Sequence, residues 1–238
     1  VLELQAGEVK DQVFSVSSPS TQLYVTIVAK DSPEAKRLQT LTNRWGEDAQ
    51  REALHNRLND LFGANGFGMT RQGPVPAELG GGMWVCRALP TRQQRMVGAW
   101  CFLDHAGPVE FAADQGMHVG AHPHIGLQTF TWMIEGELVH HDSLGNEQII
   151  RPGQINLMTA GHGIAHTEDS LHPGQRLHAA QLWIALPPEH QDCAPGFAHY
   201  PELPQWQQND ATLTLLAGRY GDAVAPTELF SPLFGLDI

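Results

Sequence analysis

Two short patterns place metal-binding side chains two residues apart. His122-Pro123-His124 carries two imidazoles at this spacing, and His166-Thr167-Glu168 carries an imidazole and a carboxylate. Because successive side chains of a β-strand point to opposite faces, residues i and i+2 share one face. Two facing strands would therefore present three ring nitrogens and one carboxylate oxygen to a single ion. This donor set suits Fe(II), Mn, Ni, Cu or Zn, and side-chain type alone does not choose among them.

Histidine is concentrated around these patterns. Nine of the 13 histidines fall within the 61 residues from His118 to His178, which indicates metal binding or proton transfer in this region. We expect His118, His162 and His178 to be hydrogen-bonded or exposed rather than part of the site. The pair His140-His141 is expected on the surface, just before a turn.

The elements that must position these residues are short strands. From Met83 onward, runs rich in apolar and β-branched residues alternate with Gly, Pro and Asn turns, which favours a β-sandwich or barrel. The predicted strands are Met83–Ala88, Gly98–Leu103, Leu127–Glu135, Glu137–His141, Glu147–Ile150, Gln154–Met158 and Ala180–Leu186.

Residues 1–82 differ in pattern from the rest of the chain. Strands are predicted at 1–6, 12–17 and 23–29, and helices at 33–42 and 47–62, the second with one apolar face. We expect two domains: residues 1–82 as an N-terminal β/α segment of unknown role, and residues 83–238 as a metal-binding domain.

Composition excludes several classes of function. The 238 residues include 14 basic and 26 acidic ones, for a net charge of −12, with no basic cluster, which argues against direct nucleic-acid binding. No apolar run is long enough to span a membrane and no export signal is apparent, so a cytoplasmic protein is expected. Cys86, Cys101 and Cys193 fit neither a disulfide framework nor a zinc motif and are predicted to be buried free thiols.

The motifs resemble a known family. Gly116 followed by His122-x-His124 resembles the first cupin motif, G-x5-H-x-H, and the stretch His122–Gly136 is similar to pirins. Further segments similar to pirins are Arg87–Pro90, Arg95–Gly98, Phe102–His105, Asp142–Asn146, Arg151–Gln154, Met158–Glu168 and Gln181–Pro187. The resemblance covers about two-thirds of the chain, from Met83 to Ile238.

The resemblance implies a fold and a site. The fold is a mainly β cupin (double-stranded β-helix) barrel of the pirin type, with an additional N-terminal segment containing strands and helices. The metal ligands would be His122, His124, His166 and Glu168, and the ion Fe(II), with Mn, Ni, Cu or Zn as alternatives. The implied activity is a dioxygenase reaction in which quercetin-like flavonols are cleaved with dioxygen, and Glu168 is the candidate catalytic base.

Two other functions fit the same resemblance. One is an iron-binding, redox-dependent regulator that binds a transcription factor or an enzyme without turnover. The other is a metal-bound scaffold whose N-terminal segment provides a partner-binding or dimerising surface.

The resemblance also implies a difference from pirins, which have two barrels. Residues 231–238 correspond to the segment that leads into the second barrel, so most of that barrel is expected to be missing. Residues 1–7 are expected to pair as a strand with residues 233–238, within one chain or by exchange in a homodimer formed through the N-terminal segment.

Overall fold

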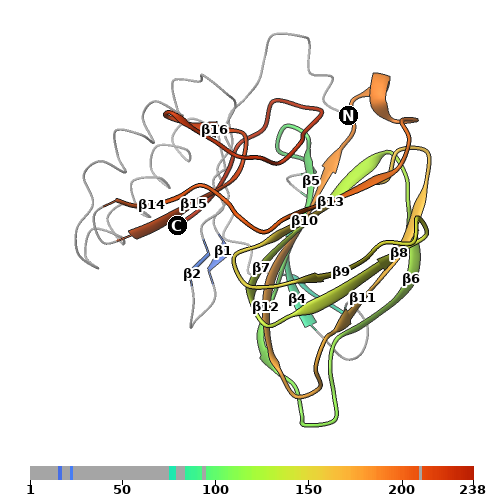
Figure 1. Cartoon of the computed structure of the whole chain (residues 1–238), viewed down its shortest axis with the longest axis vertical. Helices are drawn as coiled ribbons and strands as arrows, with labels where there is room; N and C mark the ends of the chain where they lie inside the picture. The colour runs from blue at the N-terminus through green and yellow to red at the C-terminus, as the bar shows by residue number, and fades with distance from the viewer. Residues whose placement is uncertain (1–15, 18–21, 24–74, 79–83, 93–94, 209–210) are drawn as a thin grey trace. The chain divides into compact units, whose positions relative to one another are not determined.

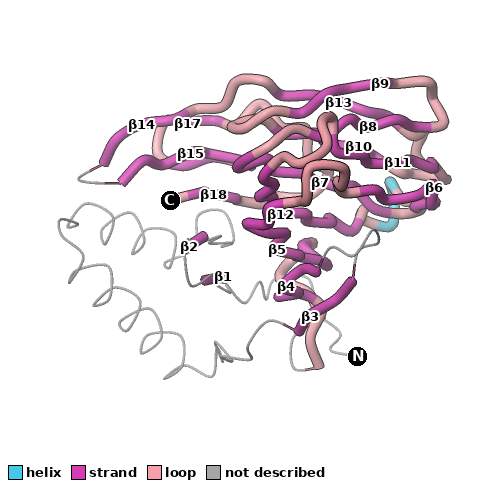
Figure 2. Tube along the Cα trace, turned by 90° about the horizontal axis from the view of Figure 1, so that it is seen from below, coloured by secondary structure: helices cyan, strands magenta, loops and turns pink. Residues whose placement is uncertain are grey.

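The protein folds almost entirely into β-strands. The computed structural model describes residues 16–17, 22–23, 75–78, 84–92, 95–208 and 211–238. Within them, the regular structure consists of strands and one short 3-10 helix, η1 (Pro188–His190), drawn in cyan in Figure 2. The predicted mainly β class is therefore confirmed. No helix in the described ranges has the length and apolar character needed to cross a membrane.

Two sheets form the compact unit Gly73–Leu203. The seven-stranded sheet has the order β13-β10-β7-β12-β5-β4-β3, and the four-stranded sheet has the order β6-β11-β8-β9; all pairs are antiparallel (Figure 1). The strands are β3 (Val75–Glu78), β4 (Trp84–Leu89), β5 (Trp100–Glu110), β6 (His118–His124), β7 (Leu127–Glu135), β8 (Leu138–Asp142), β9 (Glu147–Ile150), β10 (Ile155–Thr159), β11 (Ile164–Ser170), β12 (Arg176–Ala185) and β13 (Gly196–Tyr200).

The apolar core of this unit joins the two sheets. One cluster of buried residues combines Met133 and Ala179 of the seven-stranded sheet with Leu138 and Ile150 of the four-stranded sheet. Met133 and Thr131 share a face of β7, because side chains alternate along a strand. This face of β7 is therefore apolar at Met133 and polar at Thr131, which borders the candidate metal centre described below.

A second compact unit includes Pro204–Ile238. Its strands β14 (Gln205–Gln208), β15 (Ala211–Ala217) and β18 (Gly235–Asp237) form one sheet, and β16 (Arg219–Tyr220) pairs with β17 (Ala223–Val224). Leu213, Leu215, Phe234 and Leu236 are among its buried core residues. A further pair of strands in this unit is β1 (Val16–Ser17) with β2 (Gln22–Leu23).

Most strands predicted from residue 83 onward are present. The bounds of β7 and β9 are those predicted, whereas β5 extends to Glu110, well beyond the predicted end at Leu103. The extension includes Asp104, His105 and a Gly-Pro pair, residue types that disfavour a strand locally. The three cysteines are free, as predicted, but half-buried rather than buried.

Several N-terminal predictions fall on residues outside the described ranges. They are the helices at 33–42 and 47–62, the strand at 1–6, most of the strands at 12–17 and 23–29, and the pairing of residues 1–7 with 233–238. The division of the chain at residue 82 stays a prediction.

The turn between β10 and β11 holds the strand that carries His166. Gly161 lies in this turn with φ +51°, and a Cβ at this position would lie 2.0 Å from the backbone oxygen of Cys193. The next residue, His162, donates its backbone N–H to the same oxygen at 3.0 Å. A side chain at residue 161 would therefore push two backbone segments apart.

We predict that Gly161→Ala lowers the free energy of unfolding by about 2–4 kcal/mol, because it adds a backbone collision to the cost of a positive φ. Gly153→Ala is the matched control: its φ is +81° and nothing lies within 4 Å of the added Cβ. That variant should lose only about 1 kcal/mol. Urea unfolding of both variants tests the prediction, and equal losses would contradict it.

Candidate metal centre

The centre is built on the antiparallel pairing of β6 with β11. In this register, His166 lies directly opposite His122, and Ile164 lies opposite His124. Directly opposed residues of a strand pair have neighbouring side chains on one face of the sheet. The pairing therefore brings together three histidines, although His166 is 42 or more residues from the other two in sequence.

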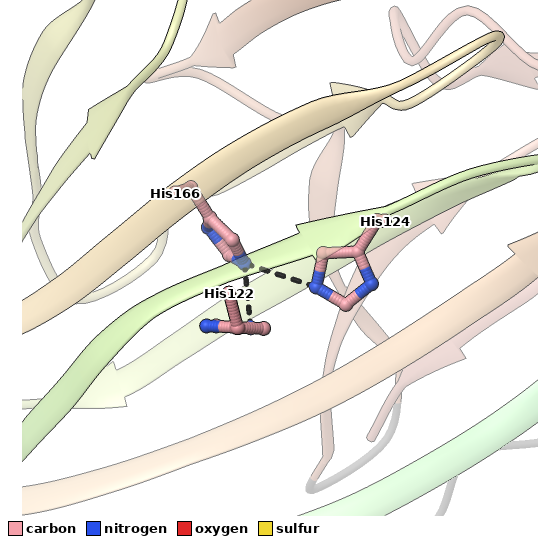
Figure 3. A group of neighbouring side chains, drawn as sticks. All are labelled: His122, His124 and His166. Atoms are coloured by element: carbon pink, nitrogen blue, oxygen red, sulfur yellow. Dashed lines mark hydrogen bonds between the residues drawn. The ribbon is translucent and has the colours of Figure 1, made fainter.

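The three rings point toward one another (Figure 3). The Nε2 atom of His166 lies 3.1 Å from Nε2 of His122 and 3.2 Å from Nε2 of His124. Nitrogens bound at about 2.0–2.1 Å to one ion lie roughly 2.8–3.4 Å apart when their bonds are at 90–110°. Both distances from His166 fall within this range, and the three nitrogens lie within 4.8 Å of one another, so the group fits ligands of one metal ion.

The hydrogen bond from His122 to the backbone supports the same conclusion. Nδ1 of His122 lies 2.8 Å from the carbonyl oxygen of Gly120, which only accepts hydrogen bonds, so Nδ1 carries the hydrogen. In the neutral ring, Nε2 then has a lone pair, and it faces His166. Nitrogen lone pairs that converge on one point are the donors that a transition metal ion requires. The residues present therefore fit a bound metal.

Burial keeps two of the histidines uncharged at neutral pH. Burial, reinforced by the nearby His122, lowers the pKa of His124 to about 4. The pKa of His166 is lowered to about 3, first by burial and then by His122, His140 and His124, while Asp142 opposes the shift. Neither ring needs to lose a proton before binding a metal at pH 7.

Glu168 lies beside the group of His122, His124 and His166 and belongs to a neighbouring group. A carboxylate oxygen of Glu168 and ring nitrogens of His140 and His166 lie within 4.8 Å of one another, so His166 belongs to two overlapping groups. Thr131 of β7 donates a hydrogen bond to Oε1 of Glu168 at 3.3 Å. Burial raises the pKa of Glu168 to about 7; the Thr131 hydrogen bond lowers it and the charge of Asp169 raises it further. The membership of Glu168 in the ligand set stays a prediction.

The expectation that His140 lies on the surface is wrong. Its side chain is 2% exposed, whereas the side chain of His141 is 47% exposed. Nδ1 of His140 lies 3.3 Å from Nδ1 of His166, and Nε2 lies 3.2 Å from Oδ2 of Asp142. The sequence held a signal for this position, because His140-x-Asp142 has the same two-residue spacing as the other two patterns.

The other histidines near the patterns lie outside the two groups. His118 and His162 are exposed, and His118 pairs with Asp169. His178 is buried, with Nε2 2.6 Å from Nε2 of His105, which makes it a hydrogen-bonded histidine as predicted. Burial, with the charge of His178, lowers the pKa of His105 to about 4, so the ring of His105 is also uncharged at neutral pH.

A polar row crosses the seven-stranded sheet beside the centre. The register places Thr131 opposite Gln181, Gln181 opposite Asp104, and Asp104 opposite Arg87, so the four share one face. The single hydroxyl hydrogen of Thr131 is shared between Oε1 of Gln181, at 2.8 Å, and Oε1 of Glu168, at 3.3 Å. Asp104 is fully buried and accepts two hydrogen bonds from Arg87, at 2.8 and 2.7 Å. Burial raises the pKa of Asp104, and the guanidinium of Arg87 counteracts this shift.

An aromatic pair lies next to the polar row and reaches the centre. The rings of Phe102 and Trp183 are stacked, with centroids 4.0 Å apart. Trp183 also meets His124 edge to face at 5.0 Å, and the guanidinium carbon of Arg87 lies 4.5 Å from the centre of the Phe102 ring. The Trp183 ring therefore borders the group of three histidines at His124.

Comparison with known proteins identifies the family of this domain. The model of the pirin family matches residues 82–184. A protein of Pseudomonas aeruginosa named "putative quercetin 2,3-dioxygenase" is 65% identical over 162 residues, which are 68% of this chain and 51% of that protein. A "pirin-like protein" of Caulobacter vibrioides is 41% identical over 162 residues, or 65% of this chain and 56% of that protein.

A solved structure shows the same fold. The crystal structure of a quercetin 2,3-dioxygenase from Acinetobacter baumannii matches with a TM-score of 0.67 and 55% identity, over 69% of this chain and 55% of that one. The cupin barrel of the pirin type is therefore confirmed as the fold. The chain spans about half the length of these two curated relatives. The part of the chain that contains residues 82–184 is therefore a domain of the pirin family.

Proposed function

We propose that the protein is a metal-dependent dioxygenase that cleaves the heterocyclic ring of quercetin-like flavonols with dioxygen. The observation that carries the proposal is the convergence of the ring nitrogens of His122, His124 and His166. The name of the Pseudomonas aeruginosa relative and that of the matched structure, which both refer to quercetin 2,3-dioxygenase, support it.

The proposed ligands are His122, His124, His166 and Glu168, and the proposed ion is Fe(II). Three neutral imidazoles and one carboxylate form a donor set of intermediate hardness, which fits a divalent first-row transition metal. A six-coordinate ion held by these four residues would keep two coordination positions free. We include Glu168 because one of its carboxylate oxygens lies within 4.8 Å of a ring nitrogen of His166.

In this proposal the bound ion supplies Lewis-acid and redox chemistry that the side chains lack. The protein residues bind, orient and move protons. Glu168 accepts the proton of the flavonol 3-hydroxyl at its carboxylate, which the Thr131 hydrogen bond holds in place. His122 is oriented by its hydrogen bond to the Gly120 carbonyl, so its lone pair faces the metal position.

The residues around the centre have the chemistry that a flavonol requires. A flavonol is flat, aromatic and rich in hydroxyl groups. Trp183, in edge contact with His124, offers an aromatic surface, and Thr131 and Gln181 offer hydrogen-bonding groups on the same sheet. Trp183 and Gln181 are half-buried, and we propose that Trp183 contacts the flavonol rings and Gln181 its hydroxyls.

The full chain should be purified anaerobically, analysed for metal, and monitored for oxygen uptake after quercetin is added. We expect stoichiometric Fe(II) and the consumption of one dioxygen per flavonol. Free Fe(II) at the same concentration is the control for uncatalysed oxidation. Bound metal without oxygen uptake would contradict the proposal and favour the iron-binding regulator predicted from the sequence.

His166→Ala is expected to reduce metal affinity by more than about 100-fold, which exceeds the typical loss for an outer hydrogen-bonding partner. The reason is that Nε2 of His166 lies 3.1 Å from Nε2 of His122 and 3.2 Å from Nε2 of His124, so its loss removes one of three converging donors. His172→Ala is the control, because His172 is an exposed histidine that pairs only loosely with Glu137, at 3.6 Å. Metal content after dialysis measures the effect, and an unchanged stoichiometry in His166→Ala would remove it from the ligand set.

Glu168→Gln is expected to retain part of the metal but to lower turnover by about 10²–10⁴-fold, the usual contribution of a general base. The amide keeps the shape of the side chain and cannot accept the substrate proton. Glu147→Gln on β9 is the matched control, since the Glu147 side chain is 73% exposed. Metal content and oxygen uptake should be measured on the same preparations. Wild-type turnover in Glu168→Gln would exclude Glu168 as the base.

A further inference from the structure

We propose that His140 and Asp142 are positioning residues that hold His166 in the one tautomer able to bind the metal through Nε2. This inference rests on the proposed function, because it takes His166 as a metal ligand. The two residues form a hydrogen-bonded chain that runs from Asp142 through His140 to Nδ1 of His166, whereas His122 and His124 face Nε2 of the same ring.

The chain uses both ring nitrogens of each histidine. Nε2 of His166 faces His122 and His124, and Nδ1 of His166 lies 3.3 Å from Nδ1 of His140. Nε2 of His140 lies 3.2 Å from Oδ2 of Asp142. The polar atoms of both rings are therefore accounted for.

Counting hydrogens assigns the direction of each bond. The Asp142 carboxylate only accepts, so Nε2 of His140 carries the hydrogen and Nδ1 of the neutral ring is an acceptor. That acceptor takes the hydrogen on Nδ1 of His166, which leaves a lone pair on Nε2 of His166. This lone pair points toward His122 and His124, where a metal bound by all three residues would lie.

Asp142 is held as a carboxylate by the turn that follows β8. Its Oδ1 accepts the backbone N–H groups of Leu144 at 2.9 Å and Asn146 at 3.1 Å. The Asn146 side-chain amide donates to both carboxylate oxygens, at 3.1 and 2.9 Å. These donors fix Oδ1 in place, so Oδ2 is the atom presented to His140.

The His140 ring is also fixed in orientation. It stacks on Phe197 of β13, with centroids 4.4 Å apart and planes 18° apart. On the backbone, Asp142 lies directly opposite His166 in the β11–β8 register. A buried, stacked ring between two fixed partners has little freedom to turn over.

Direct metal binding by His140 is the competing arrangement, since His140, His166 and Glu168 form a group of their own. An ion between the Nδ1 atoms of His140 and His166 would have to share His166 with an ion at Nε2. The His166 ring would then have to lose its remaining hydrogen. The positioning role needs no such loss, so we favour it.

The first test is the tautomer of His140 in the full chain loaded with Zn(II), a diamagnetic probe ion. Nitrogen NMR of the protein with ¹⁵N-labelled histidine separates a protonated, a lone-pair and a metal-bound ring nitrogen. We expect the hydrogen of His140 on Nε2 and a free lone pair on Nδ1. A hydrogen on Nδ1, or Zn(II) bound to Nδ1, would overturn the proposal.

The second test is Zn(II) affinity, measured by competition with a chelating dye. Asp142→Asn keeps an oxygen toward Leu144 and Asn146 and therefore turns an N–H group toward His140, which reverses the hydrogen-bond direction along the chain. His140→Phe keeps the ring stack and removes both nitrogens. Each variant should bind Zn(II) about 10–100-fold more weakly. His141→Ala, an exposed neighbour, should bind like the wild type.

The two proposals fail separately. Wild-type Zn(II) affinity in both Asp142→Asn and His140→Phe would remove the positioning role even if quercetin is consumed. If His140→Phe fails to fold, weaker Zn(II) binding by Asp142→Asn is sufficient to support the positioning role. The predicted His140 tautomer together with weakened Zn(II) binding, but without oxygen uptake, would retain the positioning role and reject the dioxygenase.

Discussion

The register between β6 and β11 is the constraint on which the candidate metal centre depends. It places His166 opposite His122, and His124, two residues further along β6, lies on the same face of the sheet. Because side chains alternate along a strand, a slip of one residue would turn both β6 histidines away from His166. The remainder of the unit serves to hold this register: β8 pairs with the other side of β11, and the apolar cluster of Met133, Leu138 and Ile150 joins the two sheets.

Burying polar groups in such a barrel is costly unless each has a partner. The structure meets this cost in different ways at different positions. Asp104 is paired with the Arg87 guanidinium, Asp142 receives N–H groups from its own turn, and the buried imidazoles of His124 and His166 remain uncharged. On β7, the polar part of the interior consequently begins two residues from the apolar cluster.

The sequence predicted features that depend on local periodicity. The two-residue spacing predicted that His122 and His124 share a face, which the structure places beside His166, and the alternation of residue types predicted β7 and β9 with their observed bounds. Arg87 and Asp104 were not predicted as partners, because their contact depends on the pairing of β4 with β5. His140 was misplaced because its nearness to a turn outweighed its spacing from Asp142. The length of β5 was underestimated because its polar residues are stabilised by long-range pairing.

The position of β6 at the end of its sheet has a mechanical consequence. Among the described strands, β6 pairs with β11 on one side only. Edge strands open locally at a lower free-energy cost than strands paired on both sides. An ion held jointly by β6 and β11 would act as a covalent-like cross-link between positions more than 40 residues apart, and would restrict the chain as a disulfide does. A bound metal would thus also raise the free-energy cost of separating β6 from β11 at the edge of the sheet.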